Sequence, residues 1–470
     1  MPDDISYHSA LIVHPDEPRV LLLPDGDGRW RLPRIVGDEP PQVTASLRDT
    51  LGLEATVLAR VDEPPDAAGQ PGHVATDEEQ PAASVFAVEP LGHAWQPPAG
   101  ARWCARDELR DLAVVVPAHA EVAAGWLREQ REGVPPLRAP WARPGWRDEA
   151  LAWVHAECAR QGRPVTGASE QLRLEAWSTV YRVPVGGATL YFKAAALVHA
   201  YEAELTRLLD ERVGPRVPHI VALDAARGWL LLEDAGTEVR ERVLAEHGAG
   251  LMAAYLPEFA RLQAAMGSDV AALLAAGCPD RRLAMLPAQF AALAADRELL
   301  LAGAPDGMPE AEYARLHALA PEVSAICVQL AAYGIPETVH HDDLGPGNVL
   351  RGPHGFVFLD WAESAVTHPF CSLMIVLRWA KLVVDCDDAA LDSLRAAYLA
   401  EWTRYGTRAE LREAAALAHR LGYLCRALTY AELVRGLEPR ARVEFAGAPA
   451  YWLRLFLRDA EVGDDPPDVG

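Results

Sequence analysis

Short apolar runs alternate with helical patterns over the first 130 residues of the chain. Two such runs, at 10–13 and 20–23, flank the turn-like sequence 15–18, and this arrangement predicts a β-hairpin. A helical pattern at 43–51 ends before Gly52, in the position where glycine favours a helix C-terminus. Further strands are predicted at 57–61 and 84–88, and further helices at 106–112 and 118–130.

A second group of strands follows residue 148 and then gives way to helices. Two of these strands are joined by Gly186-Gly187, a pair that favours hairpin turns. From residue 237 onward the pattern is that of amphipathic helices, interrupted mainly at 339–350 and 356–360. A small β-rich lobe before a larger helical lobe predicts a bilobal α+β fold. The predicted strands are 172–174, 179–184, 189–194, 219–223 and 229–233, with one helix at 197–211 among them.

Proline-rich and polar stretches divide the chain. Residues 134–147 carry four prolines between helical patterns, which indicates a linker between domains. Residues 63–81 are polar and have no apolar period, as in a long loop. The predicted organisation is an N-terminal domain at 1–133, a linker at 134–147, a β-rich lobe at 148–235, a helical lobe at 236–461 and a disordered tail at 462–470.

The charge balance excludes some classes of partner. The 470 residues carry a formal net charge of −23, which repels phosphate backbones and anionic lipids, so we expect neither nucleic acid nor a membrane as partner. The seven cysteines are scattered and form no CxxC pair, as in a protein with reduced thiols. The acidic N-terminus does not resemble a signal peptide, and we expect a soluble cytoplasmic protein.

Lysine is scarce in this chain. Only Lys193 and Lys381 are present, whereas the other basic residues are arginines. Because arginine replaces lysine almost everywhere, a lysine that remains is a candidate for a role that needs a compact ammonium group.

The candidate chemistry lies where the helical pattern is interrupted. Asp343 and Asn348 are five residues apart on a loop that contains glycine and proline, and Asp360 ends an apolar run. Phosphoryl transfer needs one carboxylate to accept the proton of the attacking hydroxyl, and an asparagine and a second carboxylate to hold magnesium. The three residues can supply these groups. The alternative is that Asp343 and Asn348 only form the local hydrogen bonds of a turn.

Residues 341–348, together with 359–361, resemble the catalytic loop and metal motif of the aminoglycoside phosphotransferase family. These proteins are small-molecule kinases with the protein-kinase fold, and the resemblance extends over about residues 148–460. It implies that Asp343 is the catalytic base, that His341 braces the loop, and that Asn348 and Asp360 bind Mg2+.

Upstream segments add nucleotide-binding residues to this resemblance. The strand that carries Lys193 is similar to the strand of the family's nucleotide lysine, which implies contact with the α- and β-phosphates of ATP. Its implied partner is Glu202, with Glu204 as the alternative. The resemblance further implies phosphate contacts near Ser178 and Thr179, and adenine contacts by backbone groups from Glu233 to Ala235.

Four departures from the family pattern affect these expectations. Asp342 stands where glycine is usual, and the phosphate loop at 175–179 contains no glycine. Thr367-His368-Pro369 replaces the usual Gly-Asp-Pro after the metal motif, and Ser372-Leu373 replaces the Asp-Leu that follows it. The last two substitutions concern the local support of the helical lobe.

Residues 1 to about 130 resemble a Nudix fold, an α/β/α arrangement. The resemblance rests on 29–33, on 47–53 and on 101–109. A working Nudix helix needs several glutamates that converge on magnesium, but Asp49 and Thr50 occupy the paired positions. We therefore expect a domain without catalytic activity that serves substrate binding or domain support.

The sequence favours an ATP- and magnesium-dependent phosphotransferase that acts on a hydroxyl of a small molecule. Aminoglycoside-like, amino-alcohol-like and sugar-like acceptors all fit, because no motif identifies the acceptor. One alternative is a kinase-like protein that binds a nucleotide or metabolite without turnover. The other is a Nudix-type hydrolase that acts through the N-terminal domain.

Overall fold

The computed structural model describes residues 7–61, 84–92, 94–246, 249–305 and 307–459. Two compact units are present: one extends to Ala196 and includes 437–441, and the other contains the remaining residues from Leu197 onward. The division therefore falls inside the predicted lobe at 148–235. The predicted loop at 63–81 and the predicted tail at 462–470 lie outside the described residues.

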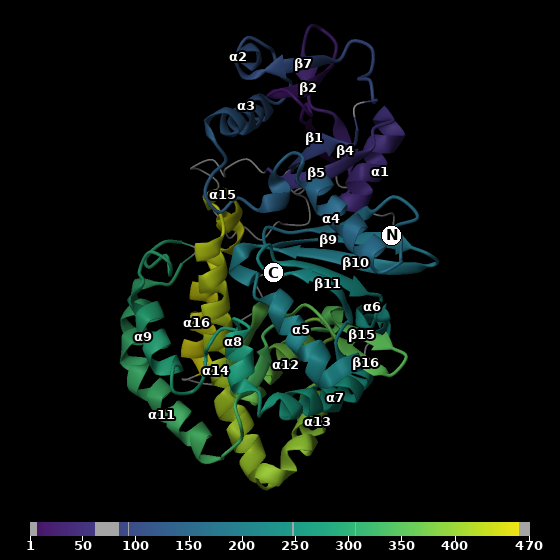
Figure 1. Ribbon diagram of the computed structural model, residues 1–470. Helices are drawn as coiled ribbons and strands as arrows, with labels where there is room; N and C mark the ends of the chain where they lie inside the picture. The colour runs from purple at the N-terminus through teal and green to yellow at the C-terminus, as the bar shows by residue number, and fades with distance from the viewer. Residues whose placement is uncertain (1–6, 62–83, 93, 247–248, 306, 460–470) are drawn as a thin grey trace. The chain divides into compact units, whose positions relative to one another are not determined.

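The first unit contains strands and helices in alternation (Figure 1). Its strands are β1 (Tyr7–Ile12), β2 (Arg19–Pro24), β3 (Trp30–Arg31), β4 (Arg34–Val36), β5 (Ala55–Arg60), β6 (Val85–Pro90), β7 (Arg102–Ala105), β8 (Glu170–Leu174), β9 (Ser178–Val185) and β10 (Ala188–Ala195). Its helices are α1 (Pro40–Leu51), α2 (Arg106–Leu109), α3 (Pro117–Glu132), α4 (Trp146–Arg160) and the short α15 (Pro439–Arg442), whose last residue belongs to the second unit.

The central sheet of the N-terminal region has a helix on each face. Its strand order is β4-β1-β6-β5, with β1 parallel to β6. Alternate residues of β1 point to opposite faces, so Ala10 and Ile12 pack with α1, whereas Leu11 packs with α3. A helix–sheet–helix layering follows from this alternation.

The predicted hairpin at 10–23 is wrong in its pairing. Only one antiparallel bridge, Val13–Val20, joins the two runs, because β1 pairs with β4 and β6 while β2 joins a separate sheet with β3 and β7. The helix predicted before Gly52 is present as α1, and Gly52 adopts the left-handed conformation with φ 60°. The helix predicted at 106–112 is shorter and ends at Leu109.

The proline-rich segment at 134–147 contributes buried side chains to the first unit. Trp141 and Trp146 are both buried. Helix α4 begins at Trp146 and was not predicted, although its buried residues Trp146, Ala150, Val154 and Cys158 follow helical spacing. The segment packs on the adjacent antiparallel strands β8, β9 and β10 through ring contacts such as Trp146 with Phe192.

The second unit is mostly helical, with short pairs of strands. Its helices are α5 (Glu202–Val213), α6 (Arg240–Ala245), α7 (Gly250–Met266), α8 (Val270–Ala275), α9 (Leu286–Ala295), α10 (Glu310–Leu316), α11 (Ala320–Ala332), α12 (Ser372–Leu382), α13 (Asp388–Leu399), α14 (Arg408–Gly436) and α16 (Ala448–Asp459). Its strands are β11 (Ile220–Asp224), β12 (Trp229–Glu233), β13 (Thr237–Glu238), β14 (Thr338–His341), β15 (Val349–Gly352), β16 (Gly355–Phe358) and β17 (Ser364–Thr367).

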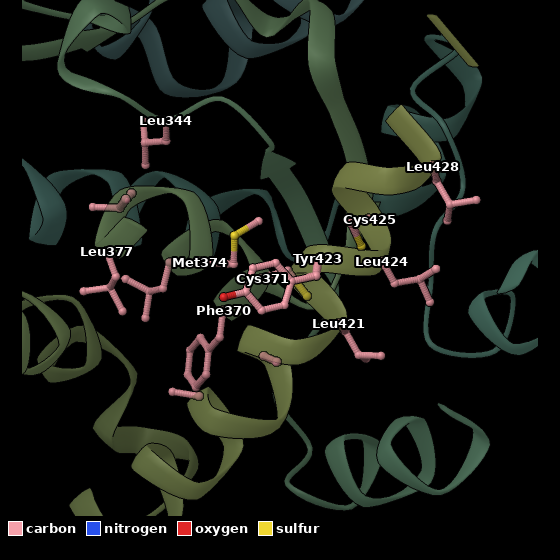
Figure 2. Packing of buried hydrophobic residues seen from close by; sticks show 14 of the residues in the cluster. Leu344, Phe370, Cys371, Met374, Leu377, Leu421, Tyr423, Leu424, Cys425 and Leu428 are labelled. Atoms are coloured by element: carbon pink, nitrogen blue, oxygen red, sulfur yellow. The ribbon is translucent and has the colours of Figure 1, made fainter. Parts of the chain in front are cut away.

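One hydrophobic cluster fills the second unit, and the long helix α14 passes through it. Figure 2 shows side chains of α12 and α14 in this cluster, among them Met374, Tyr423 and Cys425. Gly422 makes the close approach of α14 to Met374 possible, because a Cβ atom there would lie 2.7 Å from the Cβ of Met374. Leu344, in the loop after β14, belongs to the same cluster and is fully buried. The catalytic-loop segment is therefore anchored in the core.

Candidate functional site

Two antiparallel strand pairs of the second unit bring the predicted catalytic loop and the predicted metal motif together. β14 pairs with β17, and β15 pairs with β16. The loop after β14 and the segment after β16 then meet through backbone hydrogen bonds, from Leu359 N to Asn348 O at 3.1 Å and from Asp342 N to Glu363 O at 3.3 Å. The predicted catalytic loop and the predicted metal motif are therefore in direct contact.

His341 joins the two segments through both nitrogens of its ring. Its Nδ1 accepts the backbone N–H of Asp343 at 3.2 Å, and its Nε2 lies 3.0 Å from the carbonyl oxygen of Leu359, to which it donates. Burial lowers the pKa of His341, so the ring stays neutral and keeps this single tautomer. The brace predicted for His341 is thus a hydrogen-bonded link to the residue that precedes Asp360.

Asn348 holds Asp343 in place. Its side-chain N–H group donates to the backbone oxygen and to Oδ2 of Asp343, both at 2.8 Å. The Asp343 side chain is 46% exposed, so its carboxylate is accessible to a substrate. Both hydrogen bonds use the nitrogen of the Asn348 amide, so the atom that could bind a cation is the amide oxygen.

Asp360 follows the buried strand β16 in a left-handed conformation, with φ 63°. A residue with a side chain adopts this conformation at a cost of about 1–3 kcal/mol, and such residues cluster at functional sites. Asp360 directly follows Leu359, whose carbonyl oxygen accepts from His341, so the His341 ring connects the Asp343 backbone to the segment that carries Asp360.

These donors fit magnesium. The Asn348 amide oxygen and the Asp360 carboxylate are hard oxygen ligands, and Mg2+ is commonly held by one or two protein groups together with substrate phosphates and water. Among the described residues there is no group of three or more His, Cys, Asp or Glu that would form a complete protein cage. This donor set is suited to an ion that arrives with a nucleotide.

Asp342 lies next to the predicted base but faces the interior. It is fully buried, and its carboxylate accepts hydrogen bonds from His340 Nε2 at 3.1 Å and from the Thr429 hydroxyl. Arg281 lies 3.7 Å away. Burial opposes ionisation, but the attraction of His340, Arg426 and Arg281 outweighs it and holds the pKa of Asp342 below its usual value.

Arg426 of α14 connects this buried network to the predicted base. It donates to the backbone oxygen of Asp342 at 2.9 Å and to the carboxylate of Glu363, and it lies 3.5 Å from Oδ1 of Asp343. Its guanidinium also lies over the ring of Tyr430, at 4.9 Å from the ring centre. The buried Arg426 guanidinium therefore contacts three acidic residues: Glu363 and Asp343 through their carboxylates, and Asp342 through its backbone oxygen.

The two supporting motifs that depart from the family pattern make local hydrogen bonds, although Thr367 Oγ1 and His368 Nε2 are buried without a hydrogen-bond partner among the described residues. Ser372 Oγ accepts from His341 N at 3.3 Å and from Gln263 Nε2 at 3.2 Å, and lies 2.8 Å from Nδ1 of His340. His368 accepts from the backbone N–H of Phe370, and burial lowers its pKa to about 3, which keeps it neutral. Neutral hydrogen bonds thus provide local support at both positions.

Comparison with known proteins identifies the family. The model of the phosphotransferase enzyme family matches residues 170–417, more than half of the chain. The chain belongs to this family. The match confirms the predicted kinase-like fold of mixed helix and sheet, and the prediction of a phosphotransferase that acts on small molecules.

Solved structures with a similar fold are also found for this phosphotransferase. A choline/ethanolamine kinase family protein from Mesorhizobium loti is 16% identical, with a TM-score of 0.46 over 67% of this chain and 95% of that chain. An ethanolamine kinase from Plasmodium vivax is 9% identical, with a TM-score of 0.49 over 72% and 95%. A type I macrolide 2'-phosphotransferase is 15% identical, with a TM-score of 0.43 over 64% and 96%. No curated protein matches the chain.

The predicted nucleotide residues of the phosphotransferase are distributed over both units. Lys193 lies on β10 of the first unit and is only 8% exposed, unlike the exposed Lys381. In the second unit Glu202 is 2% exposed at the start of α5, whereas Glu204 forms a surface pair with Arg207 at 2.7 Å. Burial therefore distinguishes Glu202 from its alternative.

The predicted phosphate and adenine segments are held by their own unit. Thr179 is fully buried, and its hydroxyl donates to the Arg173 carbonyl oxygen at 2.9 Å, so this hydroxyl is already used within the protein. Ser178 is also buried. The predicted hinge from Glu233 to Ala235 follows directly on β12, and the next strand, β13, pairs with β15.

Sequence reasoning missed Arg281, Arg426 and Thr429. Arg426 is the only charged residue between Leu421 and Ala431, a stretch that is otherwise almost entirely apolar, and this isolation was the available signal. Arg281 carries no comparable signal, because it is one of many arginines and has another arginine beside it.

Among the described residues no helix is long and apolar enough to cross a bilayer.

Proposed function

We propose that this family member is an ATP- and Mg2+-dependent kinase that phosphorylates a hydroxyl group of a small molecule. The observation that carries the proposal is the accessible Asp343 carboxylate, fixed by the Asn348 amide and linked through His341 to Leu359, the residue before Asp360. A turn that only stabilised the backbone would not need a half-exposed carboxylate, a neutral buried histidine and a strained aspartate in adjoining segments.

In the proposed reaction Asp343 orients the acceptor hydroxyl and accepts its proton. Asn348 and Asp360 would hold Mg2+, which neutralises negative charge on the phosphates when it is bound. Lys193 would bind the α- and β-phosphates, and Glu202 would orient that lysine. His341 keeps the backbone of Asp343 fixed while the proton moves, because its neutral ring needs no change of protonation state.

The proposed acceptor is aminoglycoside-like, amino-alcohol-like or sugar-like. We also infer a cytoplasmic location and an N-terminal domain of Nudix-like shape that does not catalyse hydrolysis. The inactive role is supported by α1, where Asp49 is exposed and the Thr50 hydroxyl donates to the carbonyl oxygen of Ser46. A single carboxylate there is a poor ligand set for a diphosphate-bound metal cluster.

Substitution of the two aspartates tests the proposal. Asp343→Asn and Asp360→Asn should each lower kcat with an acceptor from a hydroxyl-compound library by about 10²- to 10⁴-fold, because each removes a charge that acts in the transition state. Asp388→Asn, at an exposed position on α13, serves as the matched control. Phosphorylated product is measured by mass spectrometry. Full turnover by a folded Asp343→Asn variant would contradict the role of the base.

A second candidate function is nucleotide binding without turnover. It is favoured by the phosphate loop at 175–179, which has no glycine and in which the Thr179 hydroxyl is occupied internally. Mg2+-dependent ATP binding by calorimetry, combined with no phosphorylated product across the same library, would support this candidate over the kinase.

A further inference from the structure

A buried polar cluster joins the N-terminal sheet to the strands that flank the predicted phosphate loop. We call it the Gln171 clasp; it consists of Thr56 and Val57 of β5, Gln171 of β8, and Thr179 and Tyr181 of β9. All five residues lie in the first unit and are at most 6% exposed. Polar groups at such depth are costly unless they are hydrogen-bonded to one another.

Gln171 uses both ends of its amide across the clasp. Its Oε1 accepts from Val57 N at 3.0 Å and from the Thr56 hydroxyl at 3.1 Å. Its Nε2 donates to Val57 O at 3.0 Å and to the Thr179 hydroxyl at 3.3 Å. The side chain therefore pairs with the backbone of Val57 as a neighbouring strand would, and reaches β9 with the same amide group.

The strands on both sides of the clasp are irregular at this point. The pairing of β5 with β6 shifts register between Val57 and Ala59, and the pairing of β8 with β9 shifts between Gln171 and Arg173. A bulge takes a residue out of the ladder and bends its strand. Backbone groups beside a bulge need other partners when they are buried, and Gln171 supplies them for Val57.

The clasp ends at the phosphate loop. Thr179 closes this loop: its hydroxyl accepts from Gln171 and donates to the carbonyl oxygen of Arg173. At the other end of the loop, the Glu175 N–H donates to Ser178 O at 2.8 Å, and the Glu175 carbonyl oxygen accepts from the Trp141 indole at 3.2 Å. Trp141, from outside the β8–β10 sheet, thus holds one end of the loop directly, whereas β5 acts on the other end through Gln171.

We propose that the N-terminal domain acts as a positioning element for the phosphate loop, with Gln171 and Thr56 as the positioning residues. This inference rests on the proposed function, because it assumes that the loop receives nucleotide phosphates. A loop without glycine has fewer backbone conformations with which to adapt to phosphate, so its shape must be set before the ligand arrives. The clasp sets that shape because Gln171 binds the Thr179 hydroxyl and is itself hydrogen-bonded to Val57 of the N-terminal domain.

The expected effect follows from the fraction of molecules with an ordered loop. If loss of the clasp lowers that fraction, the apparent dissociation constant for the nucleotide rises in inverse proportion, while kcat at saturating nucleotide changes little. Loss of one net buried hydrogen bond corresponds to about fivefold in such an equilibrium. Thr56→Val, which loses the hydrogen bonds of its hydroxyl to Gln171 and Tyr181, should therefore raise KM for ATP by at least about fivefold, and Gln171→Leu, which loses four hydrogen bonds, by more.

Matched variants separate positioning from general stability. Thr56→Ser keeps the hydroxyl and should restore the KM for ATP of the unmodified protein. Thr44→Val removes a hydroxyl from α1 of the same domain, where Thr44 donates only to Pro40 O and Pro41 O, and should leave the KM for ATP unchanged. The KM for the acceptor should not change in any of the four variants, because the clasp lies beside the phosphate loop.

Hydrogen exchange tests the clasp without reference to activity. In the full-length protein without nucleotide, Thr56→Val should speed amide exchange at 175–180 by about fivefold, while exchange at 341–348 stays as it was. Unchanged exchange at 175–180 in both Thr56→Val and Gln171→Leu would overturn the proposal. Faster exchange with unchanged KM for ATP would also overturn it. If the unmodified protein binds no ATP at all, the proposed function fails instead, and the exchange result still reports whether the clasp orders the loop.

Discussion

The catalytic loop at 341–348 and the phosphate loop at 175–179 are both held from behind by buried polar groups, but the groups differ in charge. Asp342, His340, Arg281 and Arg426 hold the catalytic loop. Neutral side chains of glutamine, threonine and tryptophan hold the phosphate loop. The first loop is anchored by its own unit, and the second by the N-terminal domain and the segment that follows it.

This difference separates two ways of fixing a loop. A buried charge network is strong when complete, but removal of one member leaves an uncompensated charge in a medium of low dielectric constant. A neutral cluster loses only the hydrogen bonds that are removed, and its strength does not depend on pH in the range where carboxylates titrate. We therefore expect the catalytic loop to respond more to mutation and to pH than the phosphate loop does.

Removal of Arg426 should have the largest effect. Arg426→Leu leaves Glu363 buried without its paired cation and the Asp342 backbone oxygen without a donor, and should lower the free energy of unfolding by about 3–5 kcal/mol. Urea denaturation measures this loss. Arg412→Leu, at an exposed position on the same helix, should change it by less than about 0.5 kcal/mol. Equal losses in the two variants would show that the charge network does not stabilise the unit.

Neutralisation of Asp342 should have an intermediate effect. Asp342→Asn keeps the shape of the side chain but removes the charge that faces Arg281 and His340, and should cost about 1–3 kcal/mol in unfolding free energy. The same denaturation experiment compares it with Thr56→Val, for which about 1 kcal/mol is expected. A smaller loss for Asp342→Asn than for Thr56→Val would show that the neutral cluster stabilises the protein more than this member of the charge network does.

The smallest effect concerns pH. Burial raises the pKa of Glu363 to about 7, although the attraction of Arg426 opposes this. The folded protein therefore binds a proton at Glu363 more tightly than the unfolded chain does, so its contribution to stability is complete below the unfolded pKa and falls as pH rises toward 7.

We expect this fall to be on the order of 1 kcal/mol between pH 6 and 7.5 in thermal or urea unfolding. Glu363→Gln should reduce this dependence of the unfolding free energy on pH. Thr56→Val should keep the same pH dependence as the unmodified protein, because the cluster that contains Thr56 is neutral. A Glu363→Gln profile as steep as that of the unmodified protein would assign the pH dependence to other groups.

Local sequence patterns predicted much of the fold and the chemical core of the site. The apolar run at 10–13 and the glycine after α1 are local features, and the structure has the corresponding strand and helix end. The spacing from His341 to Asn348 fixes which side chains can meet on one short loop, and they do meet. The partners of β1 were predicted wrongly, because strand pairing depends on residues that are distant in the chain.

The sequence by itself determined which chemical groups the protein has and their order: a lysine on an apolar strand, a His-x-Asp-x4-Asn loop and an aspartate after the next strand. Only the tertiary structure decided that Asp342 faces the interior, that Arg426 contacts it across 84 residues of sequence, and that Gln171 reaches Val57 across 114. The physical reason is that burial and hydrogen bonding depend on packing between distant segments. Local spacing cannot specify which of many arginines, or which glutamine, supplies the partner.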